Sequence, residues 1–188
     1  MGRKVLFTAS TYSHIVNFHL PYLRKFREEG WTAHVACGGA PMPIPDVERV
    51  IDLPFEKSMW SPKNLKASIL LSDEMRRENY ALIITHTSLA AFFTRLALWG
   101  LEERPKAANM VHGYLFDDET PWLKRNLLLA AERWMASDTD LALTMNQWDC
   151  ELAERYQLGG RVVQVPGVGV DFSRFDKVPP DTRQRLRK

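Results

Sequence analysis

Short runs of apolar residues alternate with longer amphipathic segments over most of the chain, and this alternation restricts the possible folds more than any other feature. Ala81–Ile84 and Leu141–Leu143 are apolar at every position, which is typical of strands covered by helices on both faces. We expect strands at Lys4–Ala9, Thr32–Cys37, Arg49–Leu53, Ala81–Thr85, Ala107–Val111, Asp140–Thr144 and Arg161–Val165. The alternation predicts an α/β fold with a doubly wound, mostly parallel sheet of about seven strands and helices on both faces.

The segments between these strands carry helix-start signals. Ser61 and Thr120 each precede a proline, which favours them as N-caps because proline suits the first helical position. Asn146 and Asp149 have the spacing of a capping box, and Asn17 is expected to cap the helix after the first strand. In parallel α/β sheets, ligands bind at the carboxyl ends of the strands. The segments that follow the strands are therefore the place to look for a site.

Composition excludes several classes of protein. The 188 residues are 45% hydrophobic and 26% charged, which is close to the average of folded globular domains and unlike disordered or fibrous chains. Lys and Arg total 25 and Asp and Glu total 23, so the net charge is +2. Nucleic-acid binding domains carry a strongly basic face, so no nucleic-acid partner is expected.

Cysteine usage and the N-terminus indicate the cellular compartment. Cys37 and Cys150 lie far apart and form no CxxC or Cys/His pattern, so neither a disulfide framework nor a metal site is expected. The apolar run near Met1 is too short for a signal peptide, and no window approaches the roughly 18 apolar residues that cross a bilayer. We expect a cytoplasmic protein, with peripheral binding to the inner face of the plasma membrane left open.

The character of the chain changes near its C-terminus. Val165–Val170 contains two glycines after the last expected strand, which is typical of a hinge between domains. Beyond the hinge the chain is polar, with Pro179-Pro180 and several basic residues. We expect a Rossmann-like domain over residues 1–172, and a linker with the start of a second, missing domain over residues 173–188.

The segment after the first strand is polar and contains no glycine. The dinucleotide fingerprint and the Walker loop both need glycine where the backbone approaches a phosphate, so neither motif is present. Ser10, Ser13, His14 and Asn17 offer hydroxyl, imidazole and amide groups that suit a hydroxyl-rich or phosphorylated ligand. The alternative is a capped start of the following helix, and the two roles are compatible.

Two histidines each end an apolar strand. His86 follows Ile84-Thr85, and His112 follows Met110-Val111. The ends of parallel strands meet at one edge of a sheet, so both imidazoles are expected at one crevice. Gly113 permits a sharp turn of the backbone and the close approach of a ligand. A structural hydrogen bond is the alternative role for each histidine.

Three further segments carry charged or aromatic side chains. The acidic triplet Asp117-Asp118-Glu119 is expected to stabilise a helix N-terminus in preference to binding a metal. Trp60 with Lys63 and Lys66 suits an anionic membrane surface, and a helix with solvated basic residues is the alternative. For Trp122–Leu129 we expect the apolar side to cover the sheet.

Several motifs, in one order along the chain, resemble family 4 glycosyltransferases of bacterial capsule and exopolysaccharide clusters. They are Phe7–Leu23, Thr85–Ser88, Val111–Tyr114, Thr144–Asp149 and Pro166–Asp171. Each motif alone is weak, but the ordered set spans nearly the whole chain and is specific. The resemblance implies a GT-B fold, in which two Rossmann-like domains face each other across a cleft. It covers the N-terminal, acceptor-side domain, and the C-terminal domain that binds the donor in the family is missing.

The resemblance also implies roles for single residues. His112 would lie near the transferred sugar and help to stabilise the transition state. Ser13, His14 and Asn17 would line the acceptor side, with His86 on the adjacent wall. Family members retain the anomeric configuration and generally need no metal, so no cofactor is expected beyond a UDP-linked sugar as co-substrate. The acceptor would be a glycan linked to polyprenyl diphosphate at the cytoplasmic membrane face.

Two other functions stay open. A non-catalytic sugar- or nucleotide-binding module would be a complete domain, and the exposed basic stub Arg183–Lys188 speaks against it. A GT-B-like sugar-nucleotide epimerase would also need a second domain, but the ordered motifs favour glycosyl transfer. If the protein is an enzyme of either kind, the chain alone is expected to be inactive.

Overall fold

A seven-stranded sheet forms the centre of the structure, a computed structural model that describes residues 2–169 and 181–186. Its strands are β1 (Lys4–Ala9), β2 (Thr32–Cys37), β3 (Arg49–Asp52), β4 (Leu82–His86), β5 (Lys106–Val111), β6 (Leu141–Thr144) and β7 (Val162–Gln164). Each expected strand is confirmed, with ends shifted by at most one residue. The expected domain boundary between residues 172 and 173 lies outside the described residues.

The strands pair in parallel in the order β3-β2-β1-β4-β5-β6-β7. The chain builds the sheet from β1 outward through β2 and β3, then returns to the other side of β1 and continues from β4 to β7. The direction of building reverses between β1 and β4, and α/β sheets bind their ligands at such a switch point. The doubly wound α/β fold expected from the sequence is confirmed.

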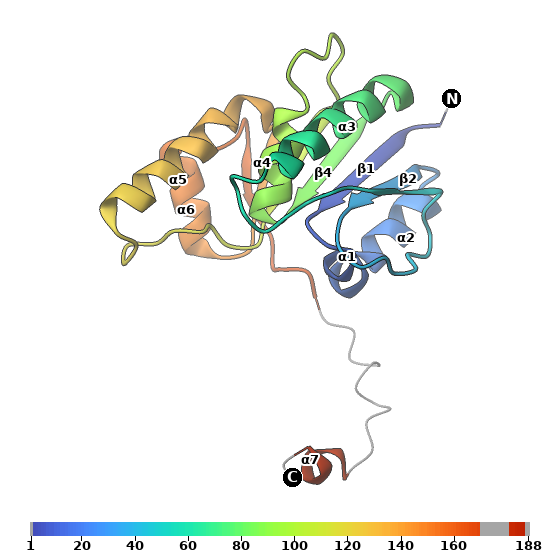
Figure 1. The fold of residues 1–188 in the computed structure, drawn as a ribbon. Coiled ribbons are helices and arrows are strands. Elements are labelled where there is room, and N and C mark those ends of the chain that lie inside the picture. The colour runs from blue at the N-terminus through green and yellow to red at the C-terminus, as the bar shows by residue number, and fades with distance from the viewer. Residues whose placement is uncertain (1, 170–180, 187–188) are drawn as a thin grey trace.

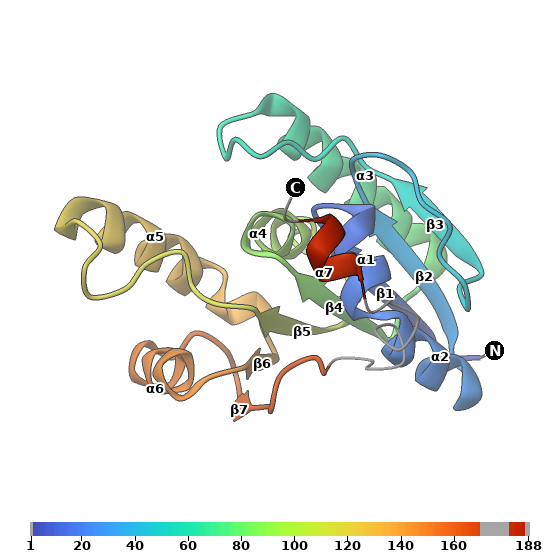
Figure 2. The ribbon, with the colours of Figure 1, turned by 90° about the horizontal axis from the view of Figure 1, so that it is seen from below.

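Helices cover both faces of the sheet (Figure 1). They are α1 (Tyr12–Phe18), α2 (Leu20–Glu28), α3 (Pro62–Glu78), α4 (Ser88–Leu96), α5 (Trp122–Trp134) and α6 (Gln147–Tyr156), with a 3₁₀ helix at Ala136–Asp138 and a short α7 at Thr182–Arg185. Figure 2 shows α3, α4 and α5 on one side of the sheet and α2 and α6 on the other. Within residues 2–169 and 181–186, no helix has both the length and the apolar character to cross a membrane.

Strand β1 shows why the apolar runs predict a sheet buried on both faces. Val5 and Phe7 pack with Ile15 in the core beneath α1 and α2. Leu6 packs with Leu71 of α3 in the core on the opposite face. Since successive side chains of a strand point to opposite faces, a strand covered on both sides buries side chains of both faces, and most of these are apolar. The last five residues of β1 are accordingly all buried.

Local signals predict some helix starts correctly and others wrongly. The side chains of Ser61 and Asn146 cap α3 and α6 as expected. Asn17 is not a cap, because α1 begins earlier and its cap is Thr11, whose hydroxyl accepts the backbone N–H of His14 at 3.3 Å. The polar stretch after β1 is therefore a short helix rather than a loop.

The acidic triplet before α5 makes two side-chain interactions, one within its own turn and one with α5. The hydroxyl of Thr120 donates to the carboxylate of Asp117 at 2.7 Å. The expected cap at Thr120 is therefore wrong, and α5 begins only at Trp122. The carboxylate of Asp118 pairs with the guanidinium of Arg125 at 3.1 Å. None of the three carboxylates lies in the first turn of α5, so the expected stabilisation of the helix N-terminus stays a prediction.

Helix α5 buries only a small part of its apolar surface. The expectation that its apolar side covers the sheet is correct for Leu129, which is buried. It is wrong for Trp122, Leu123 and Leu127, whose exposed fractions are 76%, 72% and 59%. Only the inner side of α5 packs on other elements, where Leu129 joins the core that contains Phe116 and Leu152. The first turns of α5 therefore present an apolar surface to solvent.

A buried ion pair links α5 to α4. Arg95 of α4 is completely buried, and its Nη2 donates to Oε2 of Glu132 on α5 at 3.0 Å. The remaining guanidinium groups donate to the carbonyl of Ala91 at 3.0 Å and to the hydroxyl of Thr139 at 3.2 Å. A buried charge that loses its partner is strongly destabilising. The pair therefore holds α5 in place where apolar packing is sparse.

Candidate functional site

Three neighbouring strands end together at the switch point of the sheet. Strands β1, β4 and β5 lie side by side, and Ser10, His86 and His112 lie at or directly after their carboxyl ends. Nε2 of His112 lies 3.5 Å from Nδ1 of His86. The expectation that these two imidazoles meet at one crevice is confirmed.

Four histidines gather at this edge, and we call them the histidine cluster: His14, His19, His86 and His112. One ring nitrogen of each lies within 4.8 Å of one ring nitrogen of every other. Nε2 of His14 is 3.3 Å from Nε2 of His112, and the ring of His19 stacks on the ring of His86 with centroids 3.6 Å apart. The chain has five histidines, so His34 alone lies outside the cluster.

Burial keeps the cluster in its neutral form. It lowers the pKa of His14 to about 4, with a further contribution from His112, and it lowers the pKa of His19 to about 3. Burial also places the pKa of His86 well below its ordinary value and lowers the pKa of His112. At neutral pH each ring is uncharged and offers one N–H donor and one lone pair.

Thr87 joins the ends of β1 and β4. Its hydroxyl lies 2.7 Å from the hydroxyl of Ser10 and accepts the backbone N–H of Ser10 at 3.0 Å. The backbone of Thr87 has φ 63° and ψ 131°, a conformation that β-branched residues rarely adopt. Strain of this kind is concentrated at binding and catalytic sites. Since Thr87 is the residue before α4, the unpaired N–H groups of that helix start lie at the same edge.

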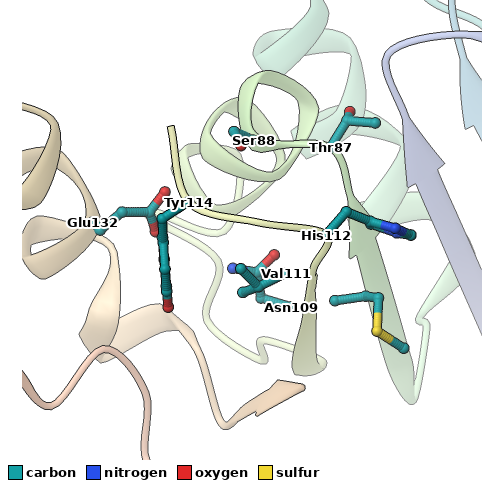
Figure 3. A pocket seen from close by; sticks show the side chains of 8 residues that line it. Thr87, Ser88, Asn109, Val111, His112, Tyr114 and Glu132 are labelled. Carbon is teal, nitrogen blue, oxygen red and sulfur yellow. The ribbon is translucent and has the colours of Figure 1, made fainter. Parts of the chain in front are cut away.

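A small pocket lies beside His112, next to the start of α4 and the inner side of α5 (Figure 3). Thr87, Tyr114 and Glu132 are among the side chains that line it, and its volume is about 40 Å³. A volume of this size holds water molecules but no sugar ring. Gly113 has φ 128° and open space where a side chain would begin, so the expected turn at this glycine is present.

The structure brings most of the candidate residues together. Those in or beside the histidine cluster are Ser10, His14, His86, His112 and Gly113. Ser13 and Asn17 are exposed on α1, and the hydroxyl of Ser13 lies 3.1 Å from the hydroxyl of Thr11. These two residues lie outside the cluster and face solvent.

Two residues of the site, His19 and Thr87, are not among the candidates that the sequence pattern indicates. His19 comes five residues after His14, and on one continuous helix this spacing puts two side chains on different sides. In the fold, His19 lies where α1 ends and α2 begins. Because the helix is interrupted there, the ring of His19 lies beside the ring of His14. For Thr87 the strained backbone has no sequence signal, since threonine is an unusual choice for a positive φ.

The fold and the site together define the class of protein. A wholly parallel Rossmann-like sheet with a polar site at its switch point is the architecture of one half of a GT-B enzyme. The chain belongs to Glycosyltransferase Family 4, whose family model matches residues 22–174. The family suggested by the ordered motifs is thereby confirmed.

Relatives agree with this assignment. EpsD of Bacillus subtilis (strain 168), which carries the name of a glycosyltransferase, is 32% identical over 190 residues that cover 100% of this chain and 50% of EpsD. The chain thus spans about half the length of this curated relative.

Solved structures share the fold. Sucrose-phosphate synthase from Thermosynechococcus elongatus matches 99% of this chain and 53% of its own, with a TM-score of 0.63 and 13% identity. Alr3699/HepE from Anabaena, solved in complex with UDP-glucose, matches 98% of this chain and 48% of its own, with a TM-score of 0.56 and 15% identity. At these identities the comparison establishes the architecture alone.

Proposed function

We propose that this chain is the acceptor-binding half of a retaining glycosyltransferase that transfers a sugar from a UDP-linked donor to a lipid-linked, growing polysaccharide. The observation that carries the proposal is a neutral histidine cluster at the strand switch point of a family 4 domain. Family membership favours glycosyl transfer over a sugar-nucleotide epimerase or a non-catalytic binding module. The UDP-glucose bound by the structurally similar HepE supports a UDP-linked donor.

The chemistry of the cluster suits hydroxyl groups better than phosphates. A neutral imidazole both donates and accepts one hydrogen bond, as a sugar hydroxyl does. His112 would bond a hydroxyl of the transferred sugar and so stabilise the transition state. A diphosphate is bound best by Arg or Lys, and the described side chains that line the pocket beside His112 include neither. The charge that develops on the UDP leaving group would then be stabilised by the second half of the enzyme.

The acceptor side is proposed to lie along α1. Ser13 and Asn17 are exposed there and offer a hydroxyl and an amide to an incoming glycan, with His14 and Ser10 beside them. His86 is 1% exposed, so it reaches no substrate directly. We assign it the role of a positioning residue, because its Nδ1 contacts Nε2 of His112.

The isolated 188-residue chain is expected to show no sugar transfer from any nucleotide-sugar. A pocket of about 40 Å³ beside His112 provides one wall of a site and no cavity for the donor. The measurement is release of UDP and labelled glycan with a panel of UDP-sugars, run beside the full-length enzyme. Turnover by the isolated chain above its substrate-free background would contradict the proposed division into two halves.

We further propose that the domain docks on an anionic membrane through two segments. Trp60, before α3, and Trp122, at the start of α5, are 86% and 76% exposed. Met59, beside Trp60, and Leu128 of α5 line one shared pocket, so the segment before α3 borders α5. The ammonium group of Lys63 pairs with Glu56, so the apolar side chains rather than this lysine would supply most of the membrane affinity.

The double variant Trp60→Ala/Trp122→Ala is expected to bind vesicles of phosphatidylglycerol and phosphatidylcholine at least about tenfold more weakly, since burying one large apolar side chain contributes about 1.5–3 kcal/mol. Co-sedimentation measures the binding. Trp148→Ala is the matched control, because α6 lies on the other side of the sheet (Figure 2). Equal loss in the control, or no loss in the double variant, would contradict the docking surface.

A further inference from the structure

A second, apolar pocket lies between the segment before α3, the segment after β5 and the inner side of α5. Its volume is about 30 Å³. Leu115 on its lining is 57% exposed and Phe116 is buried, so the pocket is closed on one side and reaches solvent on the other. A narrow hydrocarbon chain fits such a space over part of its length and gains by leaving water. Six apolar side chains line this apolar pocket: Met59, Phe92, Leu115, Phe116, Leu128 and Ala131.

The apolar pocket adjoins the pocket beside His112. Ser88, at the start of α4, and Glu132 of α5 line both pockets (Figure 3). The carboxylate of Glu132 is paired with the guanidinium of Arg95 at 3.0 Å, so it presents little net charge at the boundary. An uncharged boundary lets a single ligand extend from one pocket into the other.

The segment after β5 also joins the two pockets. His112 and Tyr114 line the first pocket, and Leu115 and Phe116 line the apolar pocket. Since consecutive Cα atoms are about 3.8 Å apart, those of His112 and Leu115 are separated by at most about 11 Å. This is comparable to the length of one sugar with a phosphate-containing linker. A ligand can therefore hold a sugar beside His112 and an apolar chain in the apolar pocket at the same time.

The apolar pocket also borders the proposed membrane surface. Met59 precedes Trp60 in the chain, and Leu128 lies on the helix that begins at Trp122. Exposing a hydrocarbon chain to water is unfavourable. Because the pocket opens beside these two exposed tryptophans, a chain anchored in the bilayer can enter it with little exposure to water.

We propose that the apolar pocket binds the part of the acceptor's hydrocarbon chain that is nearest to its sugar. The inference rests on the proposed function and adds a binding subsite to it. A membrane lipid without a sugar would gain only the apolar contacts, whereas a lipid-linked sugar also gains hydrogen bonds from the histidine cluster. Since the two pockets adjoin, the acceptor would carry only one or two sugars between its lipid and the reacting hydroxyl. The transfer would then belong to an early step of glycan assembly.

Farnesyl phosphate below its micelle-forming concentration is the probe for the hydrocarbon chain, and calorimetry with the 188-residue chain measures its binding. We expect one bound molecule per chain. Leu115→Asp should weaken the affinity by at least about tenfold, because the probe would remove water from a carboxylate. Ile69→Asp is the matched control, since Ile69 is 63% exposed on α3 and lies outside the lining of the apolar pocket. The control should bind the probe like the parent chain.

Parent-like binding by Leu115→Asp, or an equal loss in Ile69→Asp, would overturn the subsite. Photo-crosslinking of the parent chain with a diazirine derivative of farnesyl phosphate gives an answer that depends on no variant. Label on residues 113–116 or on α5 supports the apolar pocket, and label confined to other segments contradicts it. Tighter binding of lysophosphatidylglycerol at the same residues would assign the pocket to a membrane lipid and overturn the assignment to the acceptor.

Two further measurements separate the subsite from membrane docking and from the proposed function. Trp60→Ala/Trp122→Ala should lose vesicle binding and keep its affinity for farnesyl phosphate, because neither tryptophan lines the apolar pocket. Loss of both together would contradict a separate subsite. In the full-length enzyme, Leu115→Asp should raise KM for a lipid-linked acceptor by at least about tenfold and leave kcat nearly unchanged.

The two proposals fail in different ways. A chain that binds farnesyl phosphate, with a full-length enzyme that transfers no sugar, would contradict the proposed function and support the subsite. Sugar transfer with an unchanged KM in the Leu115→Asp variant would support the function and overturn the subsite.

Discussion

Replacing His112 by alanine in the full-length enzyme is expected to lower kcat by about 100- to 1,000-fold, the usual loss for one hydrogen bond that stabilises a transition state. His112 is half-buried at the switch point, and its Nε2 lies 3.3 Å from Nε2 of His14 and 3.5 Å from Nδ1 of His86. Its ring is thus packed among its neighbours and still partly exposed beside the small pocket. Initial rates with UDP-sugars measure this effect.

Two variants separate a catalytic from a structural role. His112→Asn keeps an N–H donor near the same position, and we expect it to recover part of the lost kcat. His34→Asn removes the histidine outside the cluster and should leave kcat unchanged. Thermal unfolding of the alanine variant should lie close to that of the parent enzyme. Near-parent kcat in the His112→Ala variant would remove His112 from the site.

Glu132→Ala is expected to destabilise the fold by about 3–5 kcal/mol, the effect of removing one partner of a buried ion pair. The partner, Arg95, is completely buried on α4 and would keep its charge without a carboxylate. The loss should be concentrated at α5, whose other contacts include the edge-on packing of Trp134 against Trp99 and the burial of Leu129. Urea unfolding measures the stability, and hydrogen exchange shows whether the amides of α5 lose protection first.

Two further variants serve as controls for Glu132→Ala. Arg95→Met/Glu132→Leu replaces both charges with apolar side chains of similar size, and such replacements are often neutral. Arg76→Ala breaks an exposed pair on α3 and should change stability by less than about 1 kcal/mol. If Glu132→Ala costs no more than Arg76→Ala, the buried pair does not hold α5.

Apolar periodicity determines the strands and the layered fold of this chain. Each run of apolar residues indicates only the burial of its own segment, and burial on both faces favours the nearly continuous apolar run seen at β1. The parallel arrangement follows because each strand is separated from the next by enough chain for a crossover. Helix starts are harder to predict, because Thr11 and Asn17 are equally plausible caps until packing selects one.

The candidate site is predictable where it depends on the sheet. His86 and His112 meet because neighbouring parallel strands end at the same edge, which the order of strands already implies. The exposure of Trp122 and Leu123 is different. Their spacing is that of a sheet-covering helix, but α5 lies where the sheet offers little surface, and only the tertiary arrangement contains that information.

The sequence by itself determined the α/β fold, the edge at which the site lies and the family resemblance, because periodicity and strand-end residues are local properties. The tertiary structure alone decided that His14 and His19 join His86 and His112. Their meeting depends on a break between two helices and on the packing of α1 beside β1. Distances of 3.3 and 3.5 Å between ring nitrogens arise from the whole packed core, so no local pattern of residues records them.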